Sequence, residues 1–230
     1  MPALQGSAEN AYRFGSNYFI LYLFTMDYHQ PLLAETTYHI FSRAIGNEKL
    51  FLTPENYKFF LRRFDLYISP IADVYAFNLL PNHFHAIVDI KPYDHLLPLY
   101  KAVKKSNVEH ETWQPDFVIK QFSNMLNSYT KSFNIRTNRK GALFIDNMRR
   151  VAIEKDSQLS ATIFYVHKNA VHHGYCKEIT DWPWTSYKAI LSKSPTKLKR
   201  KEIIEWFGNE AEFIKFHSQP IYLKNAVIIE

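Results

Sequence analysis

Apolar residues along the chain follow two periods, and the shorter one predicts strands. Alternating or continuous apolar residues occupy Tyr38–Ala44, Val74–Leu80 and His83–Ile90, as is typical of strands in a sheet. Pro81-Asn82 separates the last two runs and predicts a hairpin turn between them. Met148–Ile153 indicates further short strand structure later in the chain. The pattern therefore predicts an antiparallel sheet.

The longer period, about 3.6 residues, predicts helices. The expected helices are Pro54–Ile68, Phe117–Phe133, Ser157–His173 and Lys201–Phe207. Proline is favoured at the first helical position, serine at an N-cap and glycine at a C-terminal cap, so Pro54, Ser157 and Gly174 are expected to mark helix ends. Residues 91–115 are predicted to form a polar, proline-containing connection, and the residues after 207 a tail.

The order of these elements is β, α, β, β, α, β and then an extra α. This order predicts an α+β fold of the ferredoxin-like type: an antiparallel sheet with helices on one face, plus an extra C-terminal helix carrying Tyr165. We expect residues 1–35 to be an N-terminal extension, residues 36–190 the main domain, and residues 191–230 a basic C-terminal helical extension.

Composition narrows the class of protein without deciding it. Apolar residues make up 47% of the chain, which is ample for a folded core, and the net charge of +6 mildly favours a polyanionic partner. Cys176 is the only cysteine, which excludes an intrachain disulfide and a Cys-rich zinc site and favours a reducing, cytoplasmic setting. The nine-residue apolar run Tyr18–Met26 is shorter than the roughly 20 residues that span a membrane. It also lacks the features of a signal peptide, so we expect no membrane partner.

The most specific chemical motif is His83-Phe84-His85, directly after the predicted hairpin turn. Side chains alternate along a strand, so His83 and His85 point to the same face, roughly 7 Å apart along the strand. Two imidazoles on one face can share a metal ion. The alternative is a pair of half-exposed histidines on the surface of a sheet.

A second motif lies on the predicted helix Ser157–His173. Tyr165 and Asn169 are four residues apart and share one helical face. A tyrosine can attack phosphorus when a cation polarises the phosphate. The alternative is a tyrosine that packs in a core or interface, next to a solvated asparagine.

In combination, the motifs resemble the REP-associated tyrosine transposases, a family of the HUH single-tyrosine transposases. The resemblance covers about residues 35–190 in consistent order. It rests on Tyr38–Arg43, Leu80–His85, Arg139–Phe144, Tyr165–Gly174 and Asp181–Tyr187, which are similar to the first strand, the His-hydrophobic-His strand, the segment before the last strand, the tyrosine helix and the aromatic block of that family.

The resemblance implies a DNA transposase that acts on single-stranded or hairpin DNA. It implies that His83 and His85 bind a divalent metal, Mg²⁺ or Mn²⁺, that Asn169 supplies or supports a third ligand, and that Tyr165 is the catalytic nucleophile. Attack by Tyr165 on a DNA phosphate would leave a 5′-phosphotyrosine and a free 3′-OH. The family has proline after the asparagine of this helix, whereas this chain has Ala170, which weakens the carry-over for Asn169.

Several alternatives stay open. Tyr129, on the preceding helix, is a rival nucleophile, although its spacing with Phe122 and Met125 indicates packing. Trp182 and Trp184 are expected to be core or docking residues rather than base platforms. The protein could also be a non-catalytic single-stranded nucleic-acid-binding module or an inactive, domesticated transposase, and it could be a monomer or a homodimer.

Binding to DNA phosphates requires cationic side chains. The candidates for this contact are Arg136, Arg139, Lys140, Arg149, Arg150, Lys197, Lys199, Arg200 and Lys201.

Overall fold

The computed structural model describes residues 28–104, 113–145 and 148–220. The first 27 residues, including the apolar run Tyr18–Met26, lie outside the described part of the chain. The strands are β1 Thr37–Arg43, β2 Ala72–Leu80, β3 His83–Ile90 and β4 Arg149–Ala152. The helices are α1 Pro54–Ile68, α2 Tyr93–Lys104, α3 Trp113–Thr137, α4 Asp156–His172, α5 Tyr187–Leu191, α6 Arg200–Trp206 and α7 Glu210–His217, with a 3-10 turn at Ile179–Asp181.

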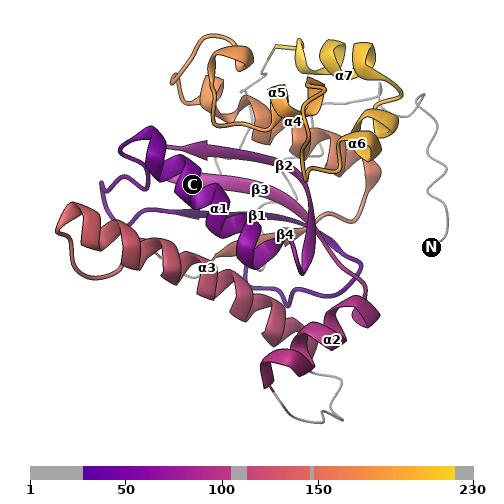
Figure 1. Cartoon of the computed structure of the whole chain (residues 1–230). Helices are drawn as coiled ribbons and strands as arrows, with labels where there is room; N and C mark the ends of the chain where they lie inside the picture. Colours follow the sequence, from indigo (N-terminus) through magenta and orange to yellow (C-terminus); the bar gives the residue numbers. More distant parts are fainter. Residues whose placement is uncertain (1–27, 105–112, 146–147, 221–230) are drawn as a thin grey trace.

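The strands form one antiparallel sheet in the order β2-β3-β1-β4. Helices connect the strands in two crossovers along the chain. Helix α1 links β1 to β2, and helices α2 and α3 link β3 to β4 (Figure 1). This topology confirms the predicted α+β, ferredoxin-like arrangement. The hairpin at Pro81-Asn82 and the strands on either side of it are also where the apolar pattern predicts them.

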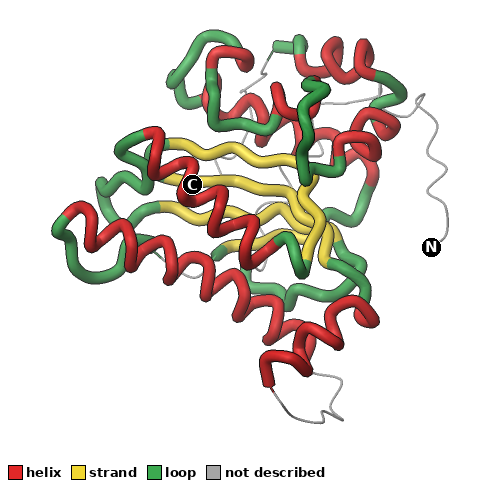
Figure 2. Tube along the Cα trace, in the orientation of Figure 1, coloured by secondary structure: helices red, strands yellow, loops and turns green. Residues whose placement is uncertain are grey.

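The predicted helices on one face are α1 and α3, whereas the extra helix α4 does not stand alone: together with α5, α6 and α7 it covers the other face (Figure 2). On β3, Phe84 and Ala86 belong to the core shared with α1 and α3, in which Phe60 and Phe122 are buried. Ile87 points to the opposite face and packs in a second core. That second core contains residues of β2, α4, α5, α6 and α7, namely Ala76, Ile163, Val166, Tyr187, Ile190, Ile203, Phe207, Phe213 and Phe216. The alternation of side chains on β3 therefore separates the α1–α3 layer from the α4–α7 layer.

The ends of α4 follow local capping rules, with one correction at the start. Lys155 is the N-cap residue and Ser157 lies inside the helix, so the prediction that Ser157 caps it is wrong. The physical reason is Gln158, whose Oε1 accepts the backbone N–H of Lys155 at 3.1 Å and satisfies the helix start two residues earlier. Gly174 has φ of 71° and ends the helix, as predicted. There, the N–H of Tyr175 donates to the carbonyl of Ala170 at 2.9 Å.

Two segments predicted without structure contain helices. Residues 91–115 include α2 and the start of α3, so the prediction of a connection is wrong for most of that range. Packing outweighs the polar composition and the internal Pro98: Leu96 is fully buried and the rings of Tyr100 and Trp113 stack with centroids 4.4 Å apart. The predicted tail after residue 207 contains α7, where Asn209 caps the helix through the N–H of Glu212 at 3.0 Å. None of the helices in the described ranges is long and apolar enough to cross a membrane.

Candidate active site

The two histidines of the His83-Phe84-His85 motif lie on the sheet face that α4 covers. His83 and His85 have exposed fractions of 8% and 1%, so the alternative of half-exposed surface histidines is wrong. Strand β1 pairs with β3 so that Arg43 lies opposite His83 and Phe41 opposite His85. Directly paired residues of an antiparallel sheet share a face, so these four side chains form one surface beneath α4.

Helix α4 brings Tyr165 and Asn169 to that surface. The ring of Tyr165 meets the ring of His85 edge-on, with centroids 5.5 Å apart. One turn later, Oδ1 of Asn169 lies 3.0 Å from Nε2 of His83. Tyr165 is half-buried and Asn169 is fully buried. The four residues singled out as nucleophile and metal ligands, from elements about 80 residues apart in sequence, therefore meet at one point.

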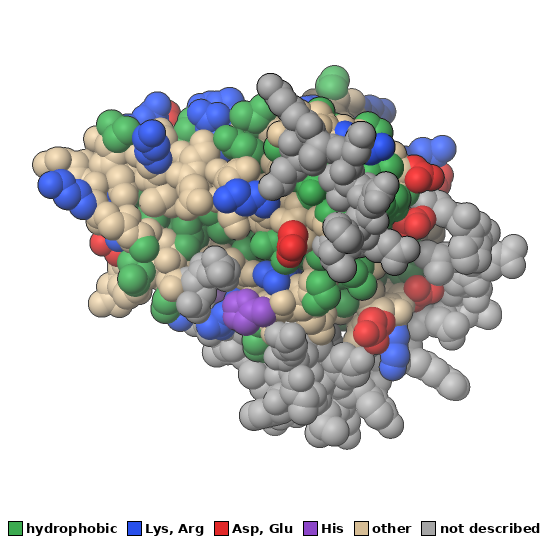
Figure 3. All heavy atoms as spheres, turned by 90° about the horizontal axis from the view of Figure 1, so that it is seen from below, with side chains coloured by type: hydrophobic (Ala, Val, Ile, Leu, Met, Phe, Trp, Pro, Cys, Tyr) green, Lys and Arg blue, Asp and Glu red, His purple; other side chains and the backbone are tan. Residues whose placement is uncertain are grey.

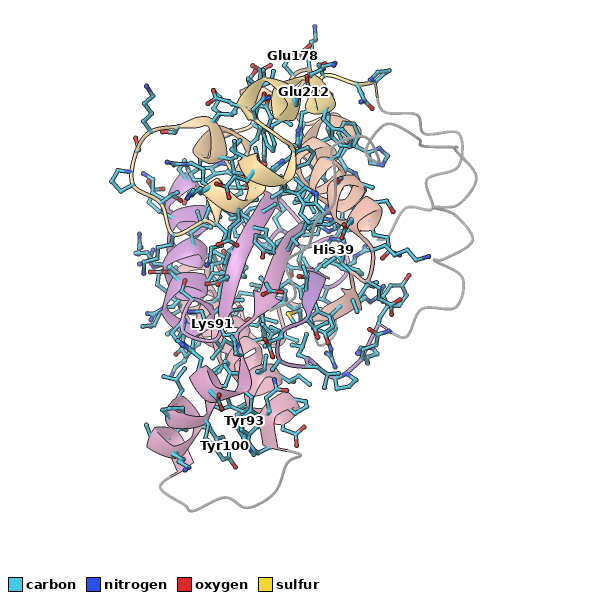
Figure 4. The ribbon with its side chains drawn as sticks, turned by 90° about the vertical axis from the view of Figure 1, so that its right-hand side faces the viewer. His39, Lys91, Tyr93, Tyr100, Glu178 and Glu212 are labelled. Carbon is cyan, nitrogen blue, oxygen red and sulfur yellow. The ribbon has the colours of Figure 1, made fainter. Side chains whose placement is uncertain are left out.

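Two further histidines that sequence reasoning missed lie in the same cluster. His39 on β1 is buried, and its Nε2 lies 3.0 Å from Nδ1 of His85 (Figure 4 labels His39). His173 follows α4, and its ring centroid lies 4.9 Å from that of His83. Two sequence signals could have indicated them. His39 lies two residues before Phe41 on the same strand and so shares its face, and His173 lies four residues after Asn169, one helical turn further on.

Burial keeps these imidazoles neutral. It lowers the pKa of His39 to about 3 and that of His83 to about 4, and it lowers the pKa of His85 well below 6.5. For His83, the hydrogen bond with Asn169 raises the pKa in part, while His173 and Arg43 lower it; for His85, the neighbouring histidines lower the pKa further. At neutral pH each ring therefore carries one N–H and one nitrogen lone pair, and a lone pair is what a metal ion binds.

The polar atoms of the cluster cannot all be paired by hydrogen bonds among themselves, and a cation would satisfy those that are left. Nε2 of His85 is buried and has no hydrogen-bond partner within the part of the chain that the structure describes. His83 faces two amide oxygens, Oδ1 of Asn82 at 2.9 Å from Nδ1 and Oδ1 of Asn169 at 3.0 Å from Nε2. A neutral imidazole has a single N–H and cannot donate to both. If Nδ1 donates to Asn82, a lone pair on Nε2 faces the oxygen of Asn169, and a shared cation relieves that repulsion.

The donor set also defines which metal chemistry it suits. The described residues contain no group of three or more His, Cys, Asp or Glu side chains placed to hold a metal ion, so a metal bound to His83 and His85 would need an amide oxygen as a further ligand. Nε2 of His83 and Oδ1 of Asn169, 3.0 Å apart, are close enough that both would reach the same cation. Two imidazoles and one amide oxygen leave further positions for water or phosphate oxygens.

Of the basic residues expected to bind DNA, Arg149 lies closest to this surface in the sheet. It pairs with Phe41 across β1 and β4 and therefore shares the face of His85, and its guanidinium lies 5.7 Å from the ring centroid of Tyr28. Arg43, which sequence reasoning did not select, is half-buried opposite His83. These two arginines give the site positive charge near the histidines.

Two other candidates donate to the protein's own backbone. Arg150 is only 6% exposed and donates to the carbonyls of His29, Gln30 and Met148, so the prediction that its side chain faces DNA is wrong. The guanidinium of Arg200 donates to the carbonyls of Ala189 and Ser194.

Four predicted DNA contacts are instead paired with acids. Lys197 lies 2.7 Å from Asp65, and Lys201 lies 3.6 Å from Glu205. Arg139 lies 3.0 Å from Glu48, and Lys199 lies 2.9 Å from Asp73 and 3.1 Å from Glu202. Folding brings these cations next to backbone carbonyls and carboxylates. The distribution of charge along the sequence does not reveal such partners.

Arg136 and Lys140, by contrast, are exposed near the end of α3. The guanidinium of Arg136 lies 5.6 Å from the ring centroid of Phe59. On the face seen from below, the visible Lys and Arg side chains are scattered rather than gathered in one continuous patch (Figure 3).

The rival tyrosine and the two tryptophans have packing roles. Tyr129 is fully buried, and its hydroxyl donates to the carbonyl of Leu50. Burial raises its pKa above the ordinary value, which disfavours the phenolate that would attack phosphorus. Trp184 stacks on Tyr57 with centroids 4.3 Å apart, and Trp182 donates to the carbonyl of Leu79 at 3.1 Å. The tryptophans are docking residues, as predicted.

The fold is similar to that of one characterised DNA-acting protein. The chain matches the solved structure of a REP-associated tyrosine transposase bound to a REP hairpin, with a TM-score of 0.51 and 16% sequence identity. The match covers 74% of this chain and 89% of the other. At this identity the likeness is one of fold, and it agrees with the family resemblance seen in the sequence motifs. No protein-family model matches the chain, and a search of curated proteins finds no match.

Proposed function

We propose that this protein is a metal-dependent, single-tyrosine transposase that cleaves and rejoins single-stranded DNA. One observation carries the proposal: a single face of α4 holds Tyr165 against His85 and the amide oxygen of Asn169 3.0 Å from His83. A phenol nucleophile and an oxygen ligand thus lie together over two neutral imidazoles. The similarity in fold to a REP-associated tyrosine transposase supports the same class of function.

In the proposed reaction, the hydroxyl oxygen of Tyr165 attacks a DNA phosphorus and loses its proton to solvent. A bond forms between this oxygen and phosphorus, and the bond from phosphorus to the 3′ oxygen breaks. The 3′ oxygen takes up a proton and leaves as a hydroxyl, while the 5′ side stays attached as a phosphotyrosine. Attack by the 3′-OH of another strand reverses these changes and releases Tyr165, so no external energy source is needed.

His83, His85 and Asn169 would hold the divalent metal, Mg²⁺ or Mn²⁺. When bound, such an ion supplies positive charge that polarises the scissile phosphate. The protein's own residues prepare the site for this ion. Burial keeps the imidazoles of His83 and His85 unprotonated, and helix α4 holds the phenol of Tyr165 beside them. Because the site is half-buried, we expect a flexible single strand or a hairpin tip, rather than paired duplex, to reach Tyr165.

Hairpin or single-stranded DNA is the partner class that we propose. The REP-associated transposase of similar fold is bound to a REP hairpin, which favours hairpin DNA as the substrate class here. Arg43 and Arg149 on the site face, and exposed Arg136 and Lys140, are the cations that we assign to phosphate contact. Their binding should weaken with salt because phosphate contacts release counterions.

The alternative of a non-catalytic module that binds single strands on its sheet has less support. Such modules stack bases on an open sheet. Here β3 is buried against α1 and α3 on one face and against α4 on the other, and Ile87 and Phe84 are both fully buried. An inactive, domesticated transposase would keep this geometry and is separated from an active one only by assay.

The test is covalent capture of Tyr165 on DNA. Incubated with hairpin-containing single-stranded DNA and Mn²⁺, the wild-type protein should form an adduct that peptide mapping by mass spectrometry locates at Tyr165. Tyr165→Phe removes one oxygen and should abolish both the adduct and strand cleavage, by at least about 1,000-fold, while leaving hairpin binding within a few-fold. Tyr175→Phe, at an exposed tyrosine beyond the end of α4, is the matched control and should cleave normally.

An adduct that persists in Tyr165→Phe would contradict the assignment and move the nucleophile elsewhere. Binding of the hairpin without cleavage by the wild-type protein, under every divalent metal tried, would favour the inactive or binding-module alternative. Equal cleavage of fully paired duplex would contradict the proposed preference for single strands.

A further inference from the structure

His39 contacts both His85, a proposed metal ligand, and Tyr165, the proposed nucleophile. Its Nε2 lies 3.0 Å from Nδ1 of His85, and its ring lies edge-on to Tyr165 with centroids 6.1 Å apart. It comes from β1, a different strand from the His83-Phe84-His85 motif, and is 4% exposed. His39 has no role in the proposed cleavage step. It is nevertheless a buried polar ring with a hydrogen bond to a proposed ligand histidine, which suggests a role in the site.

The hydrogen bond between His39 and His85 has two possible directions. If Nε2 of His39 donates, Nδ1 of His85 accepts and its proton sits on Nε2. That N–H would then be buried with no acceptor among the described residues, which is unfavourable. If Nδ1 of His85 donates instead, its proton is satisfied and Nε2 keeps an unshared lone pair. Only the second direction leaves His85 both satisfied and able to bind a cation.

We propose that His39 is a positioning residue for the metal site: its Nε2 accepts the Nδ1–H of His85 and so directs the Nε2 lone pair of His85 toward the ion. This deepens the proposed function, because it concerns the same site. Ligand histidines commonly donate their second N–H to a fixed acceptor, which sets the tautomer and orientation of the ring. Here the acceptor is another imidazole, and the same ring supports the edge of Tyr165.

The hydrogen bond is tested first without metal, DNA or activity. In metal-free protein labelled with ¹⁵N histidine, long-range ¹⁵N–¹H correlation spectra distinguish Nδ1–H from Nε2–H imidazoles. We expect His85 to be the Nδ1–H tautomer in the wild type and to lose that preference in His39→Phe. His39→Gln places an oxygen near the position of Nε2 and should retain it. Finding the Nε2–H tautomer of His85 in the wild type would overturn the proposal, whatever the protein does to DNA.

The consequence for the cation is then measured by titration with Mn²⁺, followed by calorimetry and by the electron paramagnetic resonance of the free ion. His39→Phe should weaken Mn²⁺ binding about 10–100-fold, the usual cost of removing such a partner. His39→Gln should stay within a few-fold of the wild type. His95→Gln, at an exposed histidine on α2, is the control and should change nothing. The double variant His83→Ala, His85→Ala gives the background.

Each result decides the question. Wild-type affinity in His39→Phe, with the tautomer of His85 unchanged, would overturn the positioning role. A wild-type protein that binds no Mn²⁺ above the background would overturn the metal site itself, and the spectra would still show which ring donates. If His39→Phe fails to fold, His39→Gln carries the test, since an amide that neither preserves the tautomer nor supports Mn²⁺ binding contradicts the role of an acceptor at this position.

Discussion

At the scale of residues, the neighbouring arginines Arg149 and Arg150 differ in what their guanidinium groups contact. Arg150 is buried, and its guanidinium donates to the backbone carbonyls of His29 and Gln30, in the segment before β1 that bridges to β4. Arg149, its neighbour on the strand, points to the face of His85. Adjacent residues on a strand face opposite ways, so two arginines next to each other in sequence serve different purposes.

This division predicts opposite phenotypes for two neighbouring substitutions. Arg150→Ala leaves several carbonyls without a donor and should lower the free energy of unfolding by about 3 kcal/mol, since each hydrogen bond to a charged group contributes about 1.5–3 kcal/mol. Arg149→Ala should lower the free energy of unfolding less than Arg150→Ala does, and it should reduce the salt dependence of hairpin binding by about one counterion. Urea unfolding and binding isotherms at several salt concentrations measure both. The reverse pattern would show that Arg150, not Arg149, meets DNA.

At the scale of elements, the position of α4 over the sheet decides whether the site exists. Nδ2 of Asn78 on β2 donates to the carbonyl of Val166 at 2.8 Å, in the turn of α4 that follows Tyr165. In the same turn, His167 bonds Ser186 at 2.7 Å and His217 of α7 at 3.0 Å. All of these side chains are buried. A polar network through an otherwise apolar core holds the helix in one register against β2 and α7.

Replacing Asn78 by leucine should separate stability from activity. Oδ1 of Asn78 is buried with no hydrogen-bond partner in the described chain, so the apolar substitution removes an unsatisfied group along with one hydrogen bond. We expect the free energy of unfolding to change by no more than about 1 kcal/mol. Cleavage should fall at least about 10-fold, because α4 loses the contact that sets its register beside His85.

The control for Asn78→Leu is Gln114→Leu, which removes a buried amide from α3, on the other face of the sheet. It should destabilise the protein, since Gln114 bonds the backbone of Leu32 and Ala34, but leave the cleavage rate of the folded enzyme unchanged. Normal cleavage by Asn78→Leu would show that packing alone sets the register of α4.

At the scale of the whole molecule, a set of buried neutral histidines makes the fold sensitive to acid. Burial lowers the pKa of His39 to about 3 and those of His83 and His217 to about 4, and it lowers the pKa of His85 and His167 well below 6.5. In the unfolded chain each histidine titrates near pH 6.5. Between about pH 6.5 and 4 the unfolded state therefore binds more protons than the folded state.

The sign of the effect follows from this difference in protons. The stability contributed by the neutral histidines is fully present above pH 6.5 and is lost as the pH falls toward 4. We expect the free energy of unfolding, measured with urea at steps from pH 8 to 4.5, to fall by several kcal/mol. His217→Gln should reduce the slope near pH 5 by about 1.4 kcal/mol per pH unit, the value for one proton. A flat profile over this range would contradict the buried, neutral state of these rings.

The sequence by itself determined what depends on short-range periodicity. The period of two places His83 and His85 on one face of a strand, and the period of 3.6 places Tyr165 and Asn169 on one face of a helix. Capping and turn chemistry located the start of α1 and the hairpin of β2 and β3 for the same reason, since these choices involve residues a few positions apart. Where local signals were weak, as in the polar range that contains α2, the sequence missed the helix because packing decided it.

Only the tertiary structure decided that this face of α4 lies over that face of β3. Nothing local in the chain relates Asn169 to His83, adds His39 from β1 to the cluster, or turns Arg150 inward onto backbone carbonyls. These contacts join residues far apart in sequence, and their partners are chosen by the burial of two cores on opposite sides of one sheet. Burial also lowers the pKa values of these imidazoles and so keeps them neutral, with a lone pair on one nitrogen. This desolvation exists only once the chain has folded around the rings.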